Sequence, residues 1–174
     1  LEDNDFENMY DIITEKYNDN YPYFVFKYEF SRDKNLRHWE NIIQEQFKEN
    51  DKLKCSNNID IVKLSIIETA KGFFLDINYL IYNLKPTMDG KVRDVNTAKR
   101  AKGRIIFLNN EKLALFTIGD YKHTKDLYAF FVRNYIDTIS FTPYHLNENS
   151  FKYDGPIEND RITVFLLELV TNAI

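Results

Sequence analysis

The stretch that decides the fold is Ile59–Asn83, "IDIVKLSIIETAKGFFLDINYLIYN". Both halves alternate apolar and polar side chains, and the short sequence "TAKG" (69–72) separates them. Alternation of this kind is typical of half-buried strands, and Gly72 can take the positive φ that a hairpin turn needs. One face of the second half is wholly apolar: Phe73, Leu75, Ile77, Tyr79 and Ile81. The stretch therefore predicts an antiparallel hairpin with one face in the core, although residues 73–84 also match a helical spacing.

Further strands are predicted on both sides of this hairpin. The sequences "YPYFVFKYEF" (21–30) and "TISFTPY" (138–144) carry strand patterns, and "GRIIFL" and "KLALFTIG" flank the turn "NNE" to predict a second hairpin over 104–118. We expect the two hairpins to share one sheet. The polar sequence "DKLKCSNN" (51–58) predicts a loop, and "RITVFLLELV" (161–170) predicts a buried strand or a short helix.

Three helices are expected beside the sheet. Apolar side chains recur at helical spacing over residues 3–18, over a segment after Ser31 and over 123–136. Ser31 is a candidate cap for the second helix. The inward positions of the second and third helices are Leu36, Trp39, Ile43, Phe47, Leu127, Phe130, Phe131 and Tyr135. Residues 1–174 thus predict a single α+β domain, a mainly antiparallel sheet built from hairpins with three packed helices, as part of a longer protein.

Composition excludes several classes of function. The single cysteine, Cys55, rules out a disulfide framework and a multi-cysteine zinc site. Five glycines with no cluster before a helix argue against phosphate-cradling nucleotide loops. No apolar run approaches the roughly 18 residues of a membrane span. We therefore expect a cytoplasmic protein with no membrane partner, no metal and no cofactor.

The most unusual feature is a basic segment in an otherwise acidic chain. The chain has a net charge of −4, yet residues 85–104 carry +5, so the remainder carries −9. Its main cations are Lys91, Arg93, Lys99, Arg100, Lys102 and Arg104. Three interpretations are open: a solvated connector between two hairpins, neutralisation by the acidic helix predicted at 3–18, or binding to nucleic-acid phosphate.

A second motif predicts chemistry. "GDYKHTKDLYAFF" places Asp120 and Lys122 at a strand end before a helix, which matches the acid-x-Lys pattern of metal-dependent nucleases. Such an enzyme needs a second carboxylate for Mg²⁺, for which Asp76 is the first candidate and Glu68 and Asp94 are others. The neighbouring sequence "GRIIFLNN" contains no acid, and a glycine–aspartate pair before a helix is more often a turn.

The sequence therefore favours a non-catalytic interaction domain that engages nucleic-acid phosphate through residues 91–104. The first alternative is a metal-dependent nuclease that uses Asp76, Asp120 and Lys122. The second is a protein–protein or oligomerisation module of a defence-type assembly, in which the acidic helix and the basic segment meet across subunits. A run of cations carries no base specificity, and DNA and RNA are not distinguished because both carry the phosphates that the cations would contact.

Overall fold

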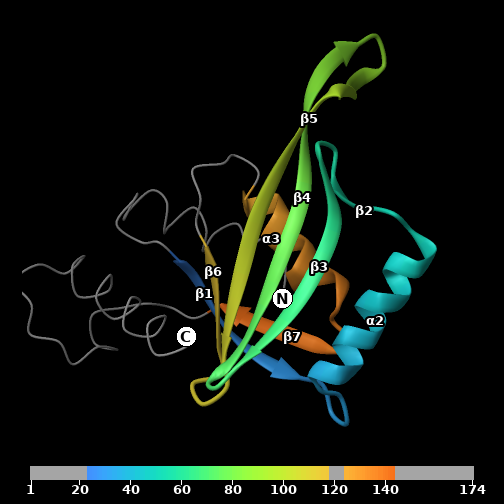
Figure 1. The fold of residues 1–174 in the computed structure, drawn as a ribbon. Helices are drawn as coiled ribbons and strands as arrows, with labels where there is room; N and C mark the ends of the chain where they lie inside the picture. The colour runs from blue at the N-terminus through green and yellow to red at the C-terminus, as the bar shows by residue number, and fades with distance from the viewer. Residues whose placement is uncertain (1–22, 118–123, 144–174) are drawn as a thin grey trace, which may run out of the picture.

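Residues 23–117 and 124–143 are described by a computed structural model of the chain (Figure 1). Their elements are β1 (Tyr23–Phe30), α2 (Leu36–Glu49), β2 (Leu53–Ser56), β3 (Ile59–Thr69), β4 (Gly72–Thr87), β5 (Gly90–Leu108), β6 (Leu113–Thr117), α3 (Thr124–Asn134) and β7 (Ile139–Pro143). The seven strands form one sheet in the order β2-β3-β4-β5-β6-β1-β7, and every neighbouring pair is antiparallel. The expected shared sheet of the two hairpins is confirmed.

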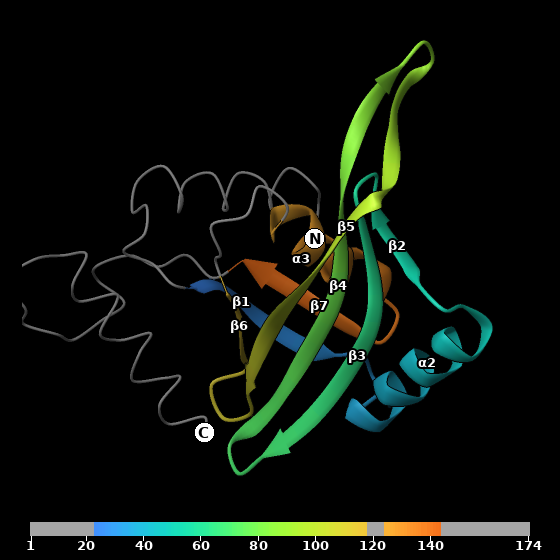
Figure 2. The same cartoon turned by 45° about the horizontal axis from the view of Figure 1, so that its top comes forward.

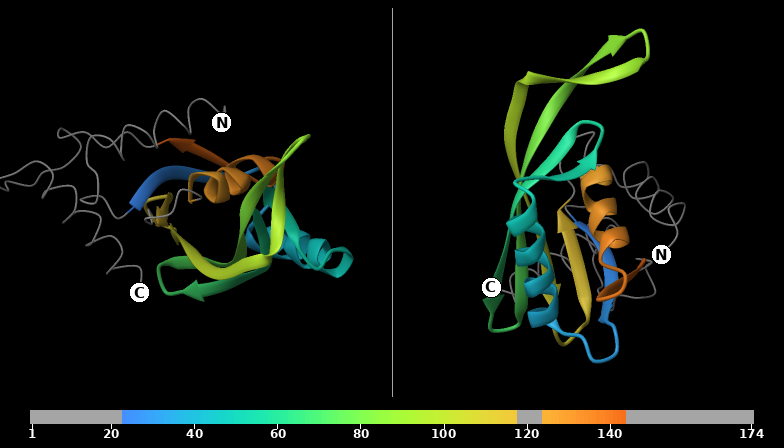
Figure 3. Two further views of the ribbon diagram at one scale, coloured as in Figure 1. Left: turned by 90° about the horizontal axis from the view of Figure 1, so that it is seen from above. Right: turned by 90° about the vertical axis from the view of Figure 1, so that its right-hand side faces the viewer.

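The sheet is curled, and the helices lie on its concave side. Seen from above, the sheet bends into a half-barrel around α3 (Figure 3). Trp39 of α2 contacts Phe73 and Phe107 edge-on, with ring centroids 6.4 and 5.7 Å apart. On α3, Tyr128 lies against Phe116, with a centroid distance of 5.0 Å. The core therefore fills the space between the concave face and the two helices.

The prediction of an α+β domain with three packed helices is wrong. The described part of the chain is mostly antiparallel strand, curled into a half-barrel, with only α2 and α3 beside it. The predicted helix at 3–18 and the predicted element at 161–170 lie outside the described residues. The strand content was underestimated because residues 53–56 and 90–103 lack strong apolar alternation and become strands through pairing with their neighbours.

The first hairpin forms as its sequence predicts, but the role of its glycine differs. Phe73, Leu75, Ile77 and Tyr79 are all buried. Thr69 pairs with Gly72, so the turn is Ala70–Lys71 and the glycine begins β4. Gly72 is not among the residues with positive φ. Glycine is required at position 72 for a different reason, which is that it has no side chain. A Cβ at this position would collide with the backbone carbonyl of Phe107 on β5.

Both described helices match their predicted faces. Trp39 and Ile43 of α2 are buried, and the inward residues of the third predicted helix, Leu127, Phe130, Phe131 and Tyr135, are buried as well. The cap of α2 is Asn35, whose side chain accepts a hydrogen bond from the backbone N–H of His38 at 3.1 Å, rather than Ser31. This bond satisfies one of the free N–H groups of the first turn.

The segment 51–58, predicted as a loop, contains the edge strand β2. Leu53 pairs with Ile61 and Lys54 with Asp60, after which the register shifts before Ser56. A four-residue strand has little apolar surface of its own, so its sequence alone does not distinguish it from a loop. Pairing with β3 supplies the backbone hydrogen bonds that fix it.

Candidate nucleic-acid interface on the β4–β5 ribbon

The basic segment is not a connector between hairpins, because it is most of strand β5. Residues 99–108 pair with 72–81 of β4, and residues 90–94 pair with 83–87. The neighbouring strands are shorter: β3 pairs with β4 no further than Ile81, and β6 reaches β5 only at 105–108. The outer part of the hairpin, residues 83–94, therefore extends beyond the sheet as a two-stranded ribbon (Figures 1 and 2). We refer to residues 83–94 as the arm.

A wide bulge separates the arm from the sheet. Ile81 pairs with Lys99 and Asn83 with Asp94, so residues 95–98 of β5 stand opposite Tyr82 alone. The bulge is held by local hydrogen bonds: the Thr97 hydroxyl donates to the Asp94 carbonyl at 2.7 Å and accepts from the Asn83 backbone N–H at 2.9 Å. Bulges bend and twist a strand pair, and this one lies where the ribbon leaves the sheet.

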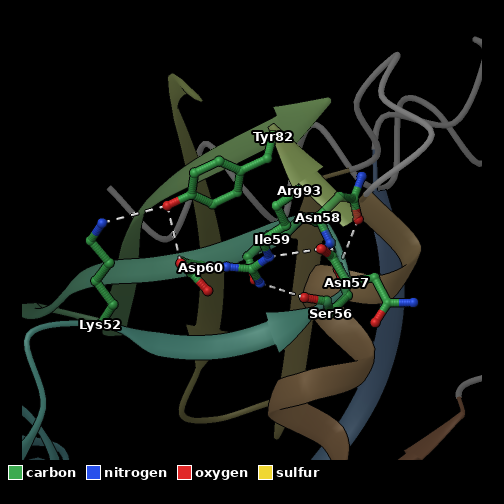
Figure 4. A network of polar contacts seen from close by, with 8 residues as sticks. All are labelled: Lys52, Ser56, Asn57, Asn58, Ile59, Asp60, Tyr82 and Arg93. Carbon is green, nitrogen blue, oxygen red and sulfur yellow. Dashed lines mark hydrogen bonds and ion pairs between the residues drawn. The ribbon is translucent and has the colours of Figure 1, made fainter. Parts of the chain in front are cut away.

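Arg93 fixes the base of the arm to the β2–β3 turn (Figure 4). Its Nη1 donates to Asp60 Oδ2 at 2.7 Å. Nε donates to the Asn57 carbonyl and Nη2 to the Ser56 carbonyl, each at 2.7 Å. The guanidinium carbon also lies 4.8 Å from the centre of the Tyr82 ring. Arg93 is therefore engaged in structural contacts within the protein.

Arg104 has a similar structural role on the sheet. It forms a bidentate pair with Asp76, with Nε–Oδ1 and Nη2–Oδ2 distances of 2.6 and 3.0 Å. The two residues face each other across β4 and β5, and the guanidinium carbon lies 4.5 Å from the centre of the Phe74 ring. The hydrogen bond to Asp76 raises the pKa of Arg104 above its already high value, so the side chain stays charged.

The other four main cations, Lys91, Lys99, Arg100 and Lys102, are exposed. No salt bridge joins any of them to an acid in residues 23–117 or 124–143. Arg100 and Lys102 share the convex face of β5 with Arg104, since strand residues two apart point to the same side. Lys99 points to the opposite face, and Lys91 lies near the arm tip, opposite Pro86. Lys91 thus lies in the arm, whereas Lys99, Arg100 and Lys102 lie on the adjoining part of β5, where β4 is also paired with β3.

Apolar side chains accompany these cations. Met88 at the tip is fully exposed, and Val92 and Val95 are 43% and 70% exposed. No described element covers the arm. An isolated two-stranded ribbon buries little apolar surface, so the contacts of Arg93 at its base are the main ones that orient it.

The nuclease residues are only partly described. Asp76 directs both carboxylate oxygens to Arg104, which removes it as a ready ligand for Mg²⁺. Asp120 and Lys122 lie outside the described residues. Among the residues that are described, no group of three or more His, Cys, Asp or Glu side chains could hold a metal ion. The nuclease alternative therefore stays a prediction without a described site.

Sequence reasoning missed the partners of Arg93. Asp60 is 7% exposed and accepts a second hydrogen bond, from the Tyr82 hydroxyl at 3.1 Å. A carboxylate inside the apolar run "IDIVKL" was a usable signal, because a buried carboxylate needs a cationic partner. The sequence could not show that this partner would be Arg93, which is 33 residues away.

Cys55 of β2 is also held in a structural contact. Its thiol donates to the Asp126 carbonyl on α3 at 3.4 Å. Burial, followed by the charges of Asp126 and Asp60, raises the pKa of the thiol to about 12, and Arg93 only partly opposes this. A thiol held neutral is a poor nucleophile, so this site argues against cysteine catalysis.

Neither described helix is long and apolar enough to cross a membrane. The fold so defined is a curled antiparallel sheet protein with a projecting basic ribbon. No family model, no characterised protein and no solved structure matches the chain.

Proposed function

We propose that this protein is a non-catalytic interaction domain that binds nucleic acid through the β4–β5 ribbon, by contact with phosphate groups. The observation that carries the proposal is a group of exposed cations that lie on one strand, β5, and form no salt bridge among the described residues: Lys91, Lys99, Arg100 and Lys102. Arg93 and Arg104 hold the ribbon in shape and are assigned a supporting role.

The geometry of a two-stranded ribbon suits a nucleic-acid groove. The major groove of duplex DNA is wide enough to admit a β-ribbon. The arm can bring Lys91 into the groove, and Lys99, Arg100 and Lys102 on the adjoining part of β5 can contact phosphates at the groove edge. The acidic remainder of the chain opposes non-specific binding elsewhere on the surface, so contact is directed to the ribbon.

The test is a titration of labelled duplex DNA and of single-stranded RNA with the whole chain at two salt concentrations. Combined replacement of Lys99, Arg100 and Lys102 by alanine should weaken binding to all sequences alike, because phosphates carry no base information. The matched control replaces two lysines and one arginine elsewhere, Lys34, Arg37 and Lys71, which are exposed and form no salt bridge among the described residues. Equal loss in both triple variants, or no binding by the wild-type chain at low salt, contradicts the proposal.

The same titration addresses the protein–protein alternative. If the basic segment serves to neutralise the acidic helix predicted at 3–18 in another subunit, the wild-type chain should not bind nucleic acid, and the triple variant should change the oligomeric state. Sedimentation velocity of wild type and variant measures this. A monomer in both cases, together with salt-dependent binding to nucleic acid, supports the ribbon as a phosphate-binding element.

A further inference from the structure

A row of apolar side chains crosses the convex face of the sheet, at the end away from the arm. It crosses β4, β5, β6 and β1, and its directly paired residues are Phe74, Ile106, Leu115 and Val25. We refer to these four residues as the convex row. The next residue on β5, Phe107, contacts Trp39 of α2 on the concave face. Because successive strand residues point to opposite faces, the convex row points away from the helices.

The convex row is buried, although neither α2 nor α3 lies on its side of the sheet (Figure 3). Phe74 and Ile106 are 8% and 5% exposed, and both Leu115 and Val25 are 0% exposed. On β3, Ile67 pairs with Phe74 and is 44% exposed, so the covered area ends between these two strands. A side chain with no exposed surface has other atoms on every side. No described element supplies those atoms, so the cover must come from another part of the chain.

One segment of the sequence has a matching need for burial. Residues 161–170, "RITVFLLELV", include seven apolar side chains among ten, and four of these are consecutive, "VFLL" (164–167). A continuous apolar run has no polar face to turn toward water, which is typical of a segment that is buried on both sides. It therefore needs an apolar partner surface, and the convex row needs an apolar cover.

The other parts of the chain are less suited to this place. Residues 1–20 carry seven carboxylates against Lys16 alone, and burying carboxylates on an aliphatic surface is unfavourable. Residues 118–123 are only six and connect β6 to α3. The composition thus favours 161–170 as the occupant.

We propose that residues 161–170 bind the convex row and form a second apolar layer on that side of the sheet. Seventeen residues, 144–160, separate this segment from β7. An extended chain of that length spans about 55 Å. The seven strands at a spacing of about 4.8 Å span only about 30 Å. The segment can therefore reach β4 from the β7 edge of the sheet.

The Asp76–Arg104 pair marks the limit of the covered area toward the arm. These residues are the next pair on the same face after Phe74 and Ile106, and both are partly exposed. Further toward the arm, Arg100 and Lys102 are exposed. Binding of 161–170 to the convex row thus leaves these two cations uncovered. The inference goes beyond the proposed function and does not depend on it.

The first experiment replaces Ile67, at the rim of the covered area, with the photo-reactive amino acid p-benzoylphenylalanine in the whole chain. After irradiation, mass spectrometry should find a cross-link to residues 161–170 of the same molecule. The same replacement at Ile42 of α2, which is similarly exposed, should give no such product. Replacement of Phe74, one strand further in, repeats the test inside the covered area. A cross-link from this face to residues 1–22 or to a second molecule, or none to 161–170 from either position, overturns the proposal.

The second experiment uncovers the convex row by the paired substitution Leu166→Asp and Leu167→Asp. Binding of a hydrophobic dye should rise at least about threefold, because apolar surface becomes exposed. The single tryptophan, Trp39, is buried on the concave side, so its emission should stay unchanged. If the emission also shifts, the whole core has opened, and the cross-link from Ile67 decides.

The matched control for the dye measurement is Tyr10→Asp with Ile13→Asp, which places the same two charges in the acidic segment. It should leave dye binding at the wild-type level. An equal rise in both variants, or a rise in the control alone, overturns the assignment of the convex row to 161–170.

Discussion

Arg93 Nη1 lies 2.7 Å from Asp60 Oδ2, although the two residues are 33 positions apart in the sequence (Figure 4). Their side chains are 23% and 10% exposed. The contact joins the base of the arm to the start of β3, and the Tyr82 hydroxyl shares the same carboxylate oxygen. The Arg104–Asp76 pair is similar in geometry but more exposed, at 45% and 28%. The two pairs allow the effect of burial to be measured within one protein.

We expect Arg93→Ala to lower the free energy of unfolding by about 2–4 kcal/mol, because it leaves the Asp60 carboxylate buried without its cation. Arg104→Ala should cost less than about 1 kcal/mol, because water can reach the half-buried Asp76 carboxylate once the arginine is removed. Urea denaturation of both variants measures the difference. If both variants lose the same free energy of unfolding, burial does not determine how much these two ion pairs contribute to stability. Asp60→Asn combined with Arg93→Ala should recover part of the loss, since no buried charge then remains.

The salt dependence of binding counts the cations that contact phosphate. Four contacts from Lys91, Lys99, Arg100 and Lys102 give a slope of log affinity against log salt of about −3.5 on duplex DNA. Six contacts would give about −5.5. Since Arg104 is paired with Asp76, Arg104→Ala should leave the slope unchanged, whereas the triple ribbon variant should flatten it by about 2.5. A slope near −5.5 that becomes shallower in Arg104→Ala would contradict this assignment, because it would mean that Arg93 and Arg104 also contact phosphate.

Gly72 should be intolerant of substitution. A Cβ at this position collides with the Phe107 carbonyl, which is backbone in the centre of the sheet and cannot move away. We expect Gly72→Ala to cost on the order of 4 kcal/mol or to prevent folding. The control is Gly90→Ala at the arm tip, where φ is +127° but no atom lies within 4 Å. Only backbone strain, about 1–2 kcal/mol, is expected there. Thermal melts of the two variants test the order.

The pKa of Cys55 makes stability fall at alkaline pH. Burial raises the pKa of the thiol to about 12 in the folded chain, whereas the unfolded chain keeps the ordinary pKa of 9.0. Between these values only the unfolded state releases the proton, so the free energy of unfolding decreases as pH rises from about 9 toward 12. The stability relative to Cys55→Ser should therefore drop by about 1–2 kcal/mol between pH 8 and pH 10.5. A difference that does not change with pH would contradict a half-buried thiol that stays neutral in the folded chain.

Tyr28 and Tyr135 contribute to this alkaline loss in both proteins, so they cancel in the comparison. Burial raises the pKa of Tyr28 to about 12, with a smaller contribution from Glu111, and burial also raises the pKa of Tyr135. Both phenols are hydrogen-bonded, Tyr135 to Gln46 Oε1 at 2.7 Å and Tyr28 to Asn109 Oδ1 at 3.3 Å. The serine variant isolates the thiol because it changes neither of them.

The sequence by itself determined the elements whose residues carry a strong periodic pattern. Alternation over 59–83 defined the β3–β4 hairpin and its core face, and helical spacing placed Trp39 and Phe131 inside. These patterns are local, because a side chain's face follows from the geometry of its own strand or helix. The same local patterns showed that positive charge is concentrated at 85–104.

Only the tertiary structure decided what that charged segment is. Residues 90–104 have no apolar periodicity, and they form a strand because β4 offers them backbone partners. Likewise, Arg93 and Arg104 look like Lys99 or Arg100 in the sequence. Their structural roles come from Asp60 and Asp76, which the fold brings across from other strands. Pairing between distant segments depends on the whole sheet. It therefore decides which cations of β5 meet an acidic partner and become structural, and which remain exposed.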